Sequence, residues 1–163
     1  MKKLLLICLF LKLPFFLFSQ TWIQLGGDID GEAAGDNSGQ SVSISSDGYT
    51  VAIGAVGNDD NGTDAGHVRV YNYNGTSWNQ LGQDIDGEAY QDNSGQSISL
   101  SSDGNTVAIG AHNNTSEAGH VCIYNYNGTS WVQLGQDIDG ENAGDNSGWS
   151  VSLSSDGNTV AIG

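Results

Sequence analysis

One stretch recurs through the chain and constrains what the chain can fold into. Segment 41–55, Ser-Val-Ser-Ile-Ser-Ser-Asp-Gly-Tyr-Thr-Val-Ala-Ile-Gly-Ala, returns almost unchanged at 97–111 and again at 150–163. Each copy alternates serine with aliphatic residues, passes through Asp-Gly and continues as the apolar run Val-Ala-Ile-Gly. A period of two on either side of an Asp-Gly turn predicts two short strands joined by a tight hairpin. The chain is therefore a repeat protein built on β-hairpins.

The full repeat is longer than the hairpin. Trp22, Trp78 and Trp131 are spaced by 56 and 53 residues, and the tetrapeptide Asp-Asn-Ser-Gly recurs at the same spacings. The difference of three residues falls in the loop at 58–64. Periods near 50 residues, with no apolar period of 3.6, are typical of propeller blades. The predicted fold class is all-β, with β-propeller blades of four antiparallel strands in periods that start near residues 22, 78 and 131.

Four strands are expected in each period, and in the first they cover 22–29, 41–45, 51–55 and 67–73. Apolar and polar residues alternate along 22–29, as they do in a strand with one solvent-exposed face. Strand 51–55 has no polar side, so both of its faces are expected to be buried. The small serines of 41–45 suit a crowded strand nearest a central axis.

Residues 21–163 hold only about two and a half such periods, whereas closed propellers have about four to eight blades. We therefore expect an incomplete open fan, truncated at its C-terminal end, whose missing blades come from a longer chain. Such a fan is expected to be marginally stable and prone to associate.

The first 20 residues read as a secretory signal peptide. Met1-Lys-Lys precedes a run of Leu, Ile and Phe that ends near residue 18, and Ser19 or Gln20 is a suitable cleavage position. The alternative is a retained membrane anchor, but the run is interrupted by Lys12 and Pro14 and a membrane span needs roughly 20 residues. The expected location is secreted or at the cell surface, with no membrane contact after cleavage.

The remaining chain is strongly acidic. Three of the four basic residues lie in the first 20, which leaves Arg69 against all 19 acidic residues. A surface of this sign repels nucleic acid and anionic lipid, and it favours cations or basic partners. Only Cys122 remains after cleavage, so no intrachain disulfide can form.

The chain resembles a known repeat family at the inner hairpin. FG-GAP repeats of exported bacterial propeller proteins read roughly Phe-Gly-x-Ser-Val, then Asp-Gly, then Val-Gly-Ala-Pro. The matching positions here are Ser38-Gly-Gln-Ser-Val42 and Ile53-Gly-Ala-Val56, with Ser in place of Phe and Val in place of Pro. The resemblance implies propeller blades, and propellers of this kind can hold calcium on Asp-x-Asp-x-Asp-Gly loops.

Calcium is the one candidate cofactor. Around Gly62, the loop at 57–64 places Asp59, Asn61 and Asp64 as candidate ligands, but a glycine stands at the first ligand position and Asp64 lies one place early. A second candidate calcium site is the group of four carboxylates in each period, which begins with Asp-Ile-Asp-Gly-Glu. The alternative interpretation is that these carboxylates are solvated strand and turn residues that bind no ion. We expect weak calcium dependence at most.

These patterns predict a non-catalytic, exported module for binding, adhesion or scaffolding at or outside the cell surface, with a protein or carbohydrate ligand. His67 and His120 recur before a strand without a nucleophile at local spacing, and a catalytic residue is expected to occur once rather than in every repeat. The alternative is a fragment of a propeller hydrolase or lyase that acts on extracellular polysaccharide.

Overall fold

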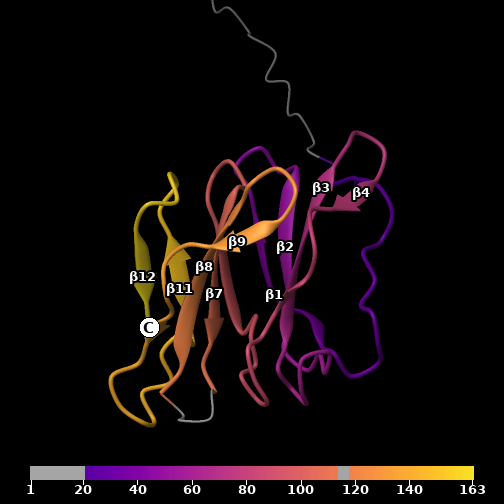
Figure 1. Ribbon diagram of the computed structural model, residues 1–163. Helices are drawn as coiled ribbons and strands as arrows, with labels where there is room; N and C mark the ends of the chain where they lie inside the picture. Colours follow the sequence, from indigo (N-terminus) through magenta and orange to yellow (C-terminus); the bar gives the residue numbers. More distant parts are fainter. Residues whose placement is uncertain (1–20, 114–117) are drawn as a thin grey trace, which may run out of the picture.

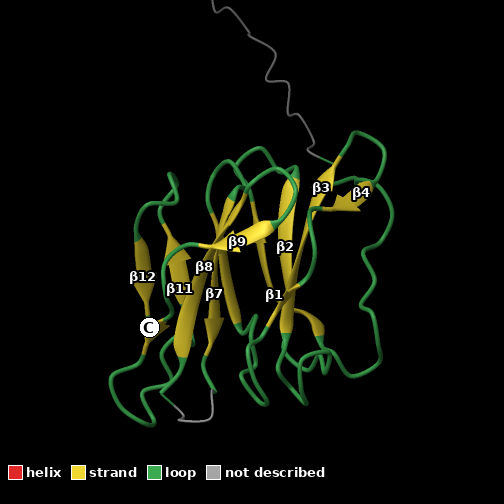
Figure 2. Ribbon diagram, viewed as in Figure 1, coloured by secondary structure: helices red, strands yellow, loops and turns green. Residues whose placement is uncertain are grey.

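The computed structural model describes residues 21–113 and 118–163. The predicted signal peptide, residues 1–20, lies outside the described residues. Within them every regular element is a β-strand (Figures 1 and 2), and no helix is long and apolar enough to cross a membrane. Blade 1 consists of β1 (Ser38–Ile44), β2 (Thr50–Ala55), β3 (His67–Tyr73), β4 (Trp78–Gln80) and β5 (Ile85–Asp86).

Blade 2 repeats this plan with β6 (Ser97–Leu100), β7 (Thr106–Ala111), β8 (His120–Tyr126), β9 (Trp131–Gln133) and β10 (Ile138–Asp139). A third sheet consists of the hairpin β11 (Val151–Leu153) and β12 (Val160–Ile162). All strand pairs within the sheets are antiparallel. Figure 1 shows the three sheets side by side, with blade 2 between the other two, as an open fan. The predicted all-β fold with an incomplete set of four-stranded blades is therefore confirmed.

The expected strand at 22–29 is wrong for the first period. Residues 22–29 form no strand in the structure. In the second period the corresponding residues form the outer edge of blade 1, where β4 and β5 both pair with β3. The outer strand of a period thus belongs to the sheet before it, and no sheet precedes blade 1 among the described residues.

A glycine also divides this outer strand. Gly82 lies between β4 and β5 with φ of 71°, a left-handed conformation that interrupts the strand. Gly26 and Gly135 stand at the same position of their copies with φ of 70° and 79°. The alternation of apolar residues did not reveal this break.

The inner hairpins close on the Ser-Asp-Gly turn, as predicted. The Ser45 hydroxyl donates to Asp47 Oδ1 at 2.6 Å and accepts the Thr50 N–H at 2.9 Å. The same two bonds recur at Ser101 and at Ser154. The turn therefore satisfies its own polar groups in every copy.

The serines of the inner strands join one blade to the next. Ser41 Oγ donates to the Gly95 carbonyl at 2.6 Å, and Ser43 Oγ accepts the Leu100 N–H at 2.9 Å. Ser97 and Ser99 make the same contacts to the third sheet, at 2.8 and 2.9 Å. These hydroxyls add to the backbone hydrogen bonds between blades, such as the Ser46 N–H to the Ser102 carbonyl at 3.0 Å, which explains why a small polar residue recurs at these positions.

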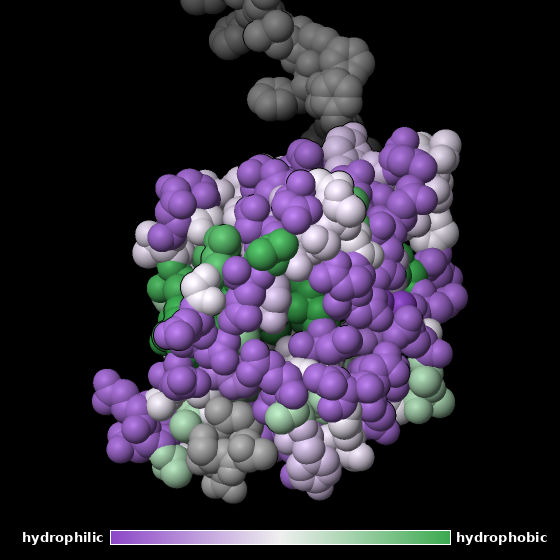
Figure 3. Space-filling model, in the orientation of Figure 1, coloured by the Kyte–Doolittle hydropathy of each residue, from purple (hydrophilic) through white to green (hydrophobic). Residues whose placement is uncertain are grey.

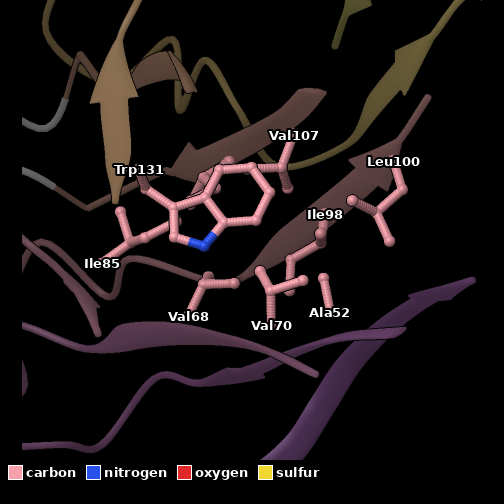
Figure 4. Close-up of a cluster of buried hydrophobic side chains, with 9 residues drawn as sticks. Ala52, Val68, Val70, Ile85, Ile98, Leu100, Val107 and Trp131 are labelled. Atoms are coloured by element: carbon pink, nitrogen blue, oxygen red, sulfur yellow. The ribbon is translucent and has the colours of Figure 1, made fainter. Parts of the chain in front are cut away.

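The hydrophobic core lies between blades 1 and 2 (Figure 4). Side chains of β2 and β3 in blade 1 point toward those of β6, β7 and β9 in blade 2, and the Trp131 ring lies among them. Trp131 also donates from Nε1 to the Leu81 carbonyl at 2.8 Å. The buried set is Ala52, Val68, Val70, Ile85, Ile98, Leu100, Val107, Ile109 and Trp131.

The face of blade 1 that carries Val42 and Ile44, called the first face below, is not covered by another sheet of the described residues. Val42 and Ile44 are 63% and 60% exposed, whereas Ile98 and Leu100, at the same positions of the next copy, are 9% and 8% exposed. The expectation that both faces of the second strand are buried holds for β7 but only partly for β2, where Val51 and Ile53 are half-buried. Figure 3 shows mostly hydrophilic residues on one side of the molecule, with apolar residues visible between them.

Candidate functional site

Two groups of metal-ligand-type side chains lie at equivalent places in blades 1 and 2. The His67 cluster contains Glu32, Asp60, His67 and Asp84, and one ligand atom of each lies within 4.8 Å of the others. The Cys122 cluster contains Glu88, Cys122 and Asp137 at the same spacing. Glu88 and Asp137 stand at the repeat positions of Glu32 and Asp84, and Cys122 stands at the position of Arg69.

The motif Asp-Ile-Asp-Gly-Glu supplies carboxylates to both clusters. Its first residue in the second period, Asp84, lies in the His67 cluster, and its last, Glu88, lies in the Cys122 cluster. Between them, Gly87 donates its N–H to the Gly66 carbonyl at 2.7 Å, and a Cβ on Gly87 would lie 2.0 Å from the Ala65 carbonyl oxygen. The close backbone contact requires glycine here, and it directs the chain from one blade to the next.

His67, the first residue of β3, is the buried centre of its cluster. Its side chain is 2% exposed. Its Nδ1 atom lies 3.8 Å from Glu32 Oε2 and 4.0 Å from Asp84 Oδ2, and it is one of two buried side-chain polar atoms with no hydrogen-bond partner among the described residues. Buried polar atoms in proteins are nearly always partnered, so this nitrogen requires an explanation.

Two of the three carboxylates around His67 are each held by a neighbour. Arg69 Nη1 lies 3.3 Å from Glu32 Oε1, and Gln80 Nε2 donates to Asp84 Oδ1. The other oxygen of each carboxylate is the one that faces His67 Nδ1. The Asp60 N–H donates to Asn58 Oδ1 at 3.0 Å, and this bond closes the turn that carries Asp60.

The thiol of the second cluster is held in its protonated form. Cys122 Sγ donates to Asp137 Oδ1 at 3.2 Å, and Gln133 Nε2 donates to the same oxygen at 2.6 Å. Burial, followed by the hydrogen bond and negative charge of Asp137, raises the pKa of Cys122 far above its ordinary value. Since the thiolate is the reactive form, Cys122 is unsuited to be a nucleophile.

An open hollow of about 460 Å³ lies beside the Cys122 cluster. Burial and the nearby Asp137 raise the pKa of Glu88 in its wall. The lining of the hollow carries carboxylate and amide groups rather than apolar ones. It consists of Glu88, Gln133, Gly135, Gln136, Asp137 and Asp139. Such a lining suits cationic groups or hydroxyl groups.

The predicted calcium ligands lie in the loop between β2 and β3 and take part in its hydrogen bonds. Asp59 Oδ1 accepts the Asp64 N–H at 2.8 Å, and Asn61 Nδ2 donates to the Gly87 carbonyl at 2.7 Å. Asp64 adopts a left-handed φ of 53°. Calcium binding by Asp59, Asn61 and Asp64 stays a prediction.

The fourth carboxylate of each period closes a turn. Asp36, Asp92 and Asp145 accept the N–H of the residue three places earlier, at 3.2, 2.7 and 2.7 Å. Spacing along the chain did not reveal Asp60 as a neighbour of His67, seven residues later, because the fold sets the direction of a loop side chain. The one available signal was the recurrence of His67 and His120 beside an acidic motif.

These sheets define a β-propeller-type repeat protein in which the candidate sites lie at equivalent places in blades 1 and 2. The family model of the FG-GAP repeat matches residues 29–71, so this segment is an FG-GAP-type repeat, as the resemblance implied. The segment runs from the acidic motif through β1 and β2 into β3, and it contains Glu32, Asp60 and His67. No curated protein matches the chain.

Proposed function

We propose that the chain is a non-catalytic, exported propeller module that binds a protein or carbohydrate partner, for adhesion or scaffolding, at or outside the cell surface. The observation that carries the proposal is the recurrence of one acidic arrangement from blade to blade. Glu32 with Asp84 in blade 1 and Glu88 with Asp137 in blade 2 present the same groups at successive positions. A repeated surface suits multivalent binding better than a single reaction centre.

The charge of the module favours cationic or hydroxyl-rich ligands. Arg69, the single basic side chain after residue 20, is 7% exposed and paired with Glu32. It therefore adds little positive charge to the surface. The exposed rings of Tyr90 and Trp149, at 53% and 58% exposure, supply flat apolar area beside the polar loops, as sugar-binding and protein-binding surfaces require.

The non-catalytic part of the proposal rests on the same recurrence and on the state of the Cys122 thiol. The carboxylates of the two clusters recur in both blades, and the Cys122 thiol is held protonated beside Asp137. An acid–base pair for glycoside hydrolysis needs one carboxyl group poised as a proton donor, and Glu88, whose pKa is raised beside Asp137, is the group that an enzymatic reading would use. Incubation with extracellular polysaccharides is expected to give no new reducing ends and no unsaturated products.

Export is tested by the start of the mature chain. N-terminal sequencing of secreted protein is expected to begin near Gln20 or Thr21. Recovery of the chain with Met1 in the membrane fraction would contradict export.

Binding is tested on the purified chain by surface immobilisation. A panel of neutral polysaccharides and a basic polypeptide such as polylysine is passed over it at low and high salt. We expect saturable binding of one member that weakens severalfold in Glu88→Gln and Asp139→Asn, which alter the hollow, and persists in Asp47→Asn, which lies at a hairpin turn. Polysaccharide cleavage, or equal binding by all variants, would refute the proposal.

A further inference from the structure

We infer that the His67 cluster is a binding site for a divalent transition-metal ion of the zinc class, with His67 Nδ1 and carboxylate oxygens of Glu32, Asp60 and Asp84 as ligands. The inference starts from the buried imidazole. Nδ1 has no hydrogen-bond partner within residues 21–113 and 118–163, the His67 side chain is 2% exposed, and Nδ1 faces two carboxylate oxygens at 3.8 and 4.0 Å. This geometry directs Nδ1 into a group of acidic side chains.

The four ligand atoms of the cluster lie slightly farther from one another than the ligands of a bound zinc ion do. All four ligand atoms lie within 4.8 Å of one another. Ligands at about 2.0–2.2 Å from a tetrahedral zinc ion lie roughly 3.3 Å from each other. Glu32 and Asp84 keep 40% and 23% of their side-chain surface exposed. Small side-chain rotations therefore suffice to close the site around an ion.

The charge of the cluster also matches a divalent ion. Three carboxylates and the Arg69 guanidinium, which contacts Glu32 at 3.3 Å, leave two negative charges beside a buried ring. Like charges at this spacing repel, and one divalent cation cancels them. Arg69 and Gln80 each hold the carboxylate oxygen that faces away from Nδ1, which is the supporting arrangement seen around metal ligands.

The donor set selects the class of metal. Calcium and magnesium take oxygen ligands, whereas an imidazole nitrogen with carboxylates suits zinc and related transition metals. This site shares no ligand with the calcium loop expected from Asp59, Asn61 and Asp64. Glu32 and Asp84 also belong to the repeated acidic arrangement on which the proposed function rests. The binding test for that function uses variants of the hollow in blade 2, so the two proposals can fail separately.

The test is calorimetric titration of zinc chloride into the chain without a histidine tag and with Cys122→Ser, which removes the thiol of the second cluster. One equivalent is expected to bind and to raise the melting temperature. Binding is expected to weaken by about tenfold or more in His67→Asn and in Asp60→Asn. Asp60 is exposed, so its isosteric variant keeps the fold even where a change at buried His67 does not.

Two controls make the result specific. Asp59→Asn, one residue from Asp60 in the same loop, is expected to bind zinc as the parent does, and excess calcium is expected not to displace the zinc. The nitrogen NMR signal of His67 Nδ1, identified by its absence in His67→Asn, is expected to shift on zinc addition. No saturable binding, unchanged affinity in Asp60→Asn, or displacement by calcium would overturn the assignment.

Discussion

Gly110 of β7 lies where the backbones of blade 2 and the third sheet meet. A Cβ at this position would lie 2.0 Å from the Gly148 carbonyl oxygen and 2.4 Å from Ser97 Oγ. The neighbouring atom is backbone and is held by Ser97, which donates to it at 2.8 Å. At the scale of single residues, the missing side chain of glycine therefore sets how closely the sheets approach.

Gly110→Ala is expected to lower the free energy of unfolding by about 2–4 kcal/mol, because the sheets must separate to admit a methyl group. Urea denaturation of the parent and the variant measures the difference. The control is Gly27→Ala, since a Cβ on Gly27 meets no atom within 4 Å. Equal loss of stability in both variants would contradict the close-contact explanation.

Asp103 is expected to make the stability of the hairpin turn depend on pH. The Ser101 hydroxyl and the Asn105 N–H donate to Oδ1 at 2.6 and 3.0 Å. These hydrogen bonds lower the pKa of Asp103 below its ordinary value. A lowered folded-state pKa stabilises the fold above the unfolded value of about 3.9, and that stabilisation is lost as the pH falls through the folded-state pKa.

Asp103→Asn is therefore expected to cost up to about 1 kcal/mol at pH 7, a small figure because the carboxylate is largely exposed to solvent. The difference from the parent is expected to shrink as the pH falls below about 3.9 and to vanish at a low pH below the folded-state pKa, where the aspartate is neutral. Urea unfolding at both pH values measures it. A difference of the same size at both values would show that the charge plays no part.

At the scale of elements, the inner hairpin has different energetics in each copy. Leu100 of β6 is 8% exposed because blade 1 covers it, whereas Ile44 of β1, at the same repeat position, is 60% exposed. The two residues share a local sequence and a turn, so only the neighbouring sheet distinguishes them.

Leu100→Ala is expected to cost about 2–5 kcal/mol through lost burial and a residual cavity. Ile44→Ala, its matched control, is expected to cost about 0.5 kcal/mol or less, as exposed substitutions usually do. Thermal or urea unfolding of the two variants provides the comparison. Similar costs at the two sites would mean that the first face is also covered in solution.

At the scale of the whole molecule, the fan presents apolar residues that no sheet covers. Val42 and Ile44 stand on the first face, and the edge strands β11 and β12 form the last sheet. Exposed apolar patches and unpaired strand edges favour association.

We expect the average molar mass of the purified chain to rise with concentration. Replacing both exposed residues, Val42→Lys and Ile44→Lys, is expected to reduce this association without lowering the melting temperature, because neither side chain is buried. Light scattering across a concentration series measures the effect. A monomer at all concentrations, or unchanged association in the double variant, would rule out this face as its origin.

The sequence alone determined the repeat, the inner hairpins and the all-β fold, because these depend on alternation and turn chemistry within a few residues. The Ser-Asp-Gly turns and the strands at 51–55 and 67–73 follow from such local patterns. Tertiary structure decided what depends on neighbours in space. It left 22–29 without a partner strand, assigned Ser41 and Ser43 to inter-blade hydrogen bonds, and brought Glu32 and Asp84 beside His67. Pairing between distant segments has no signature in spacing along the chain, so only the fold could decide which carboxylates share a site.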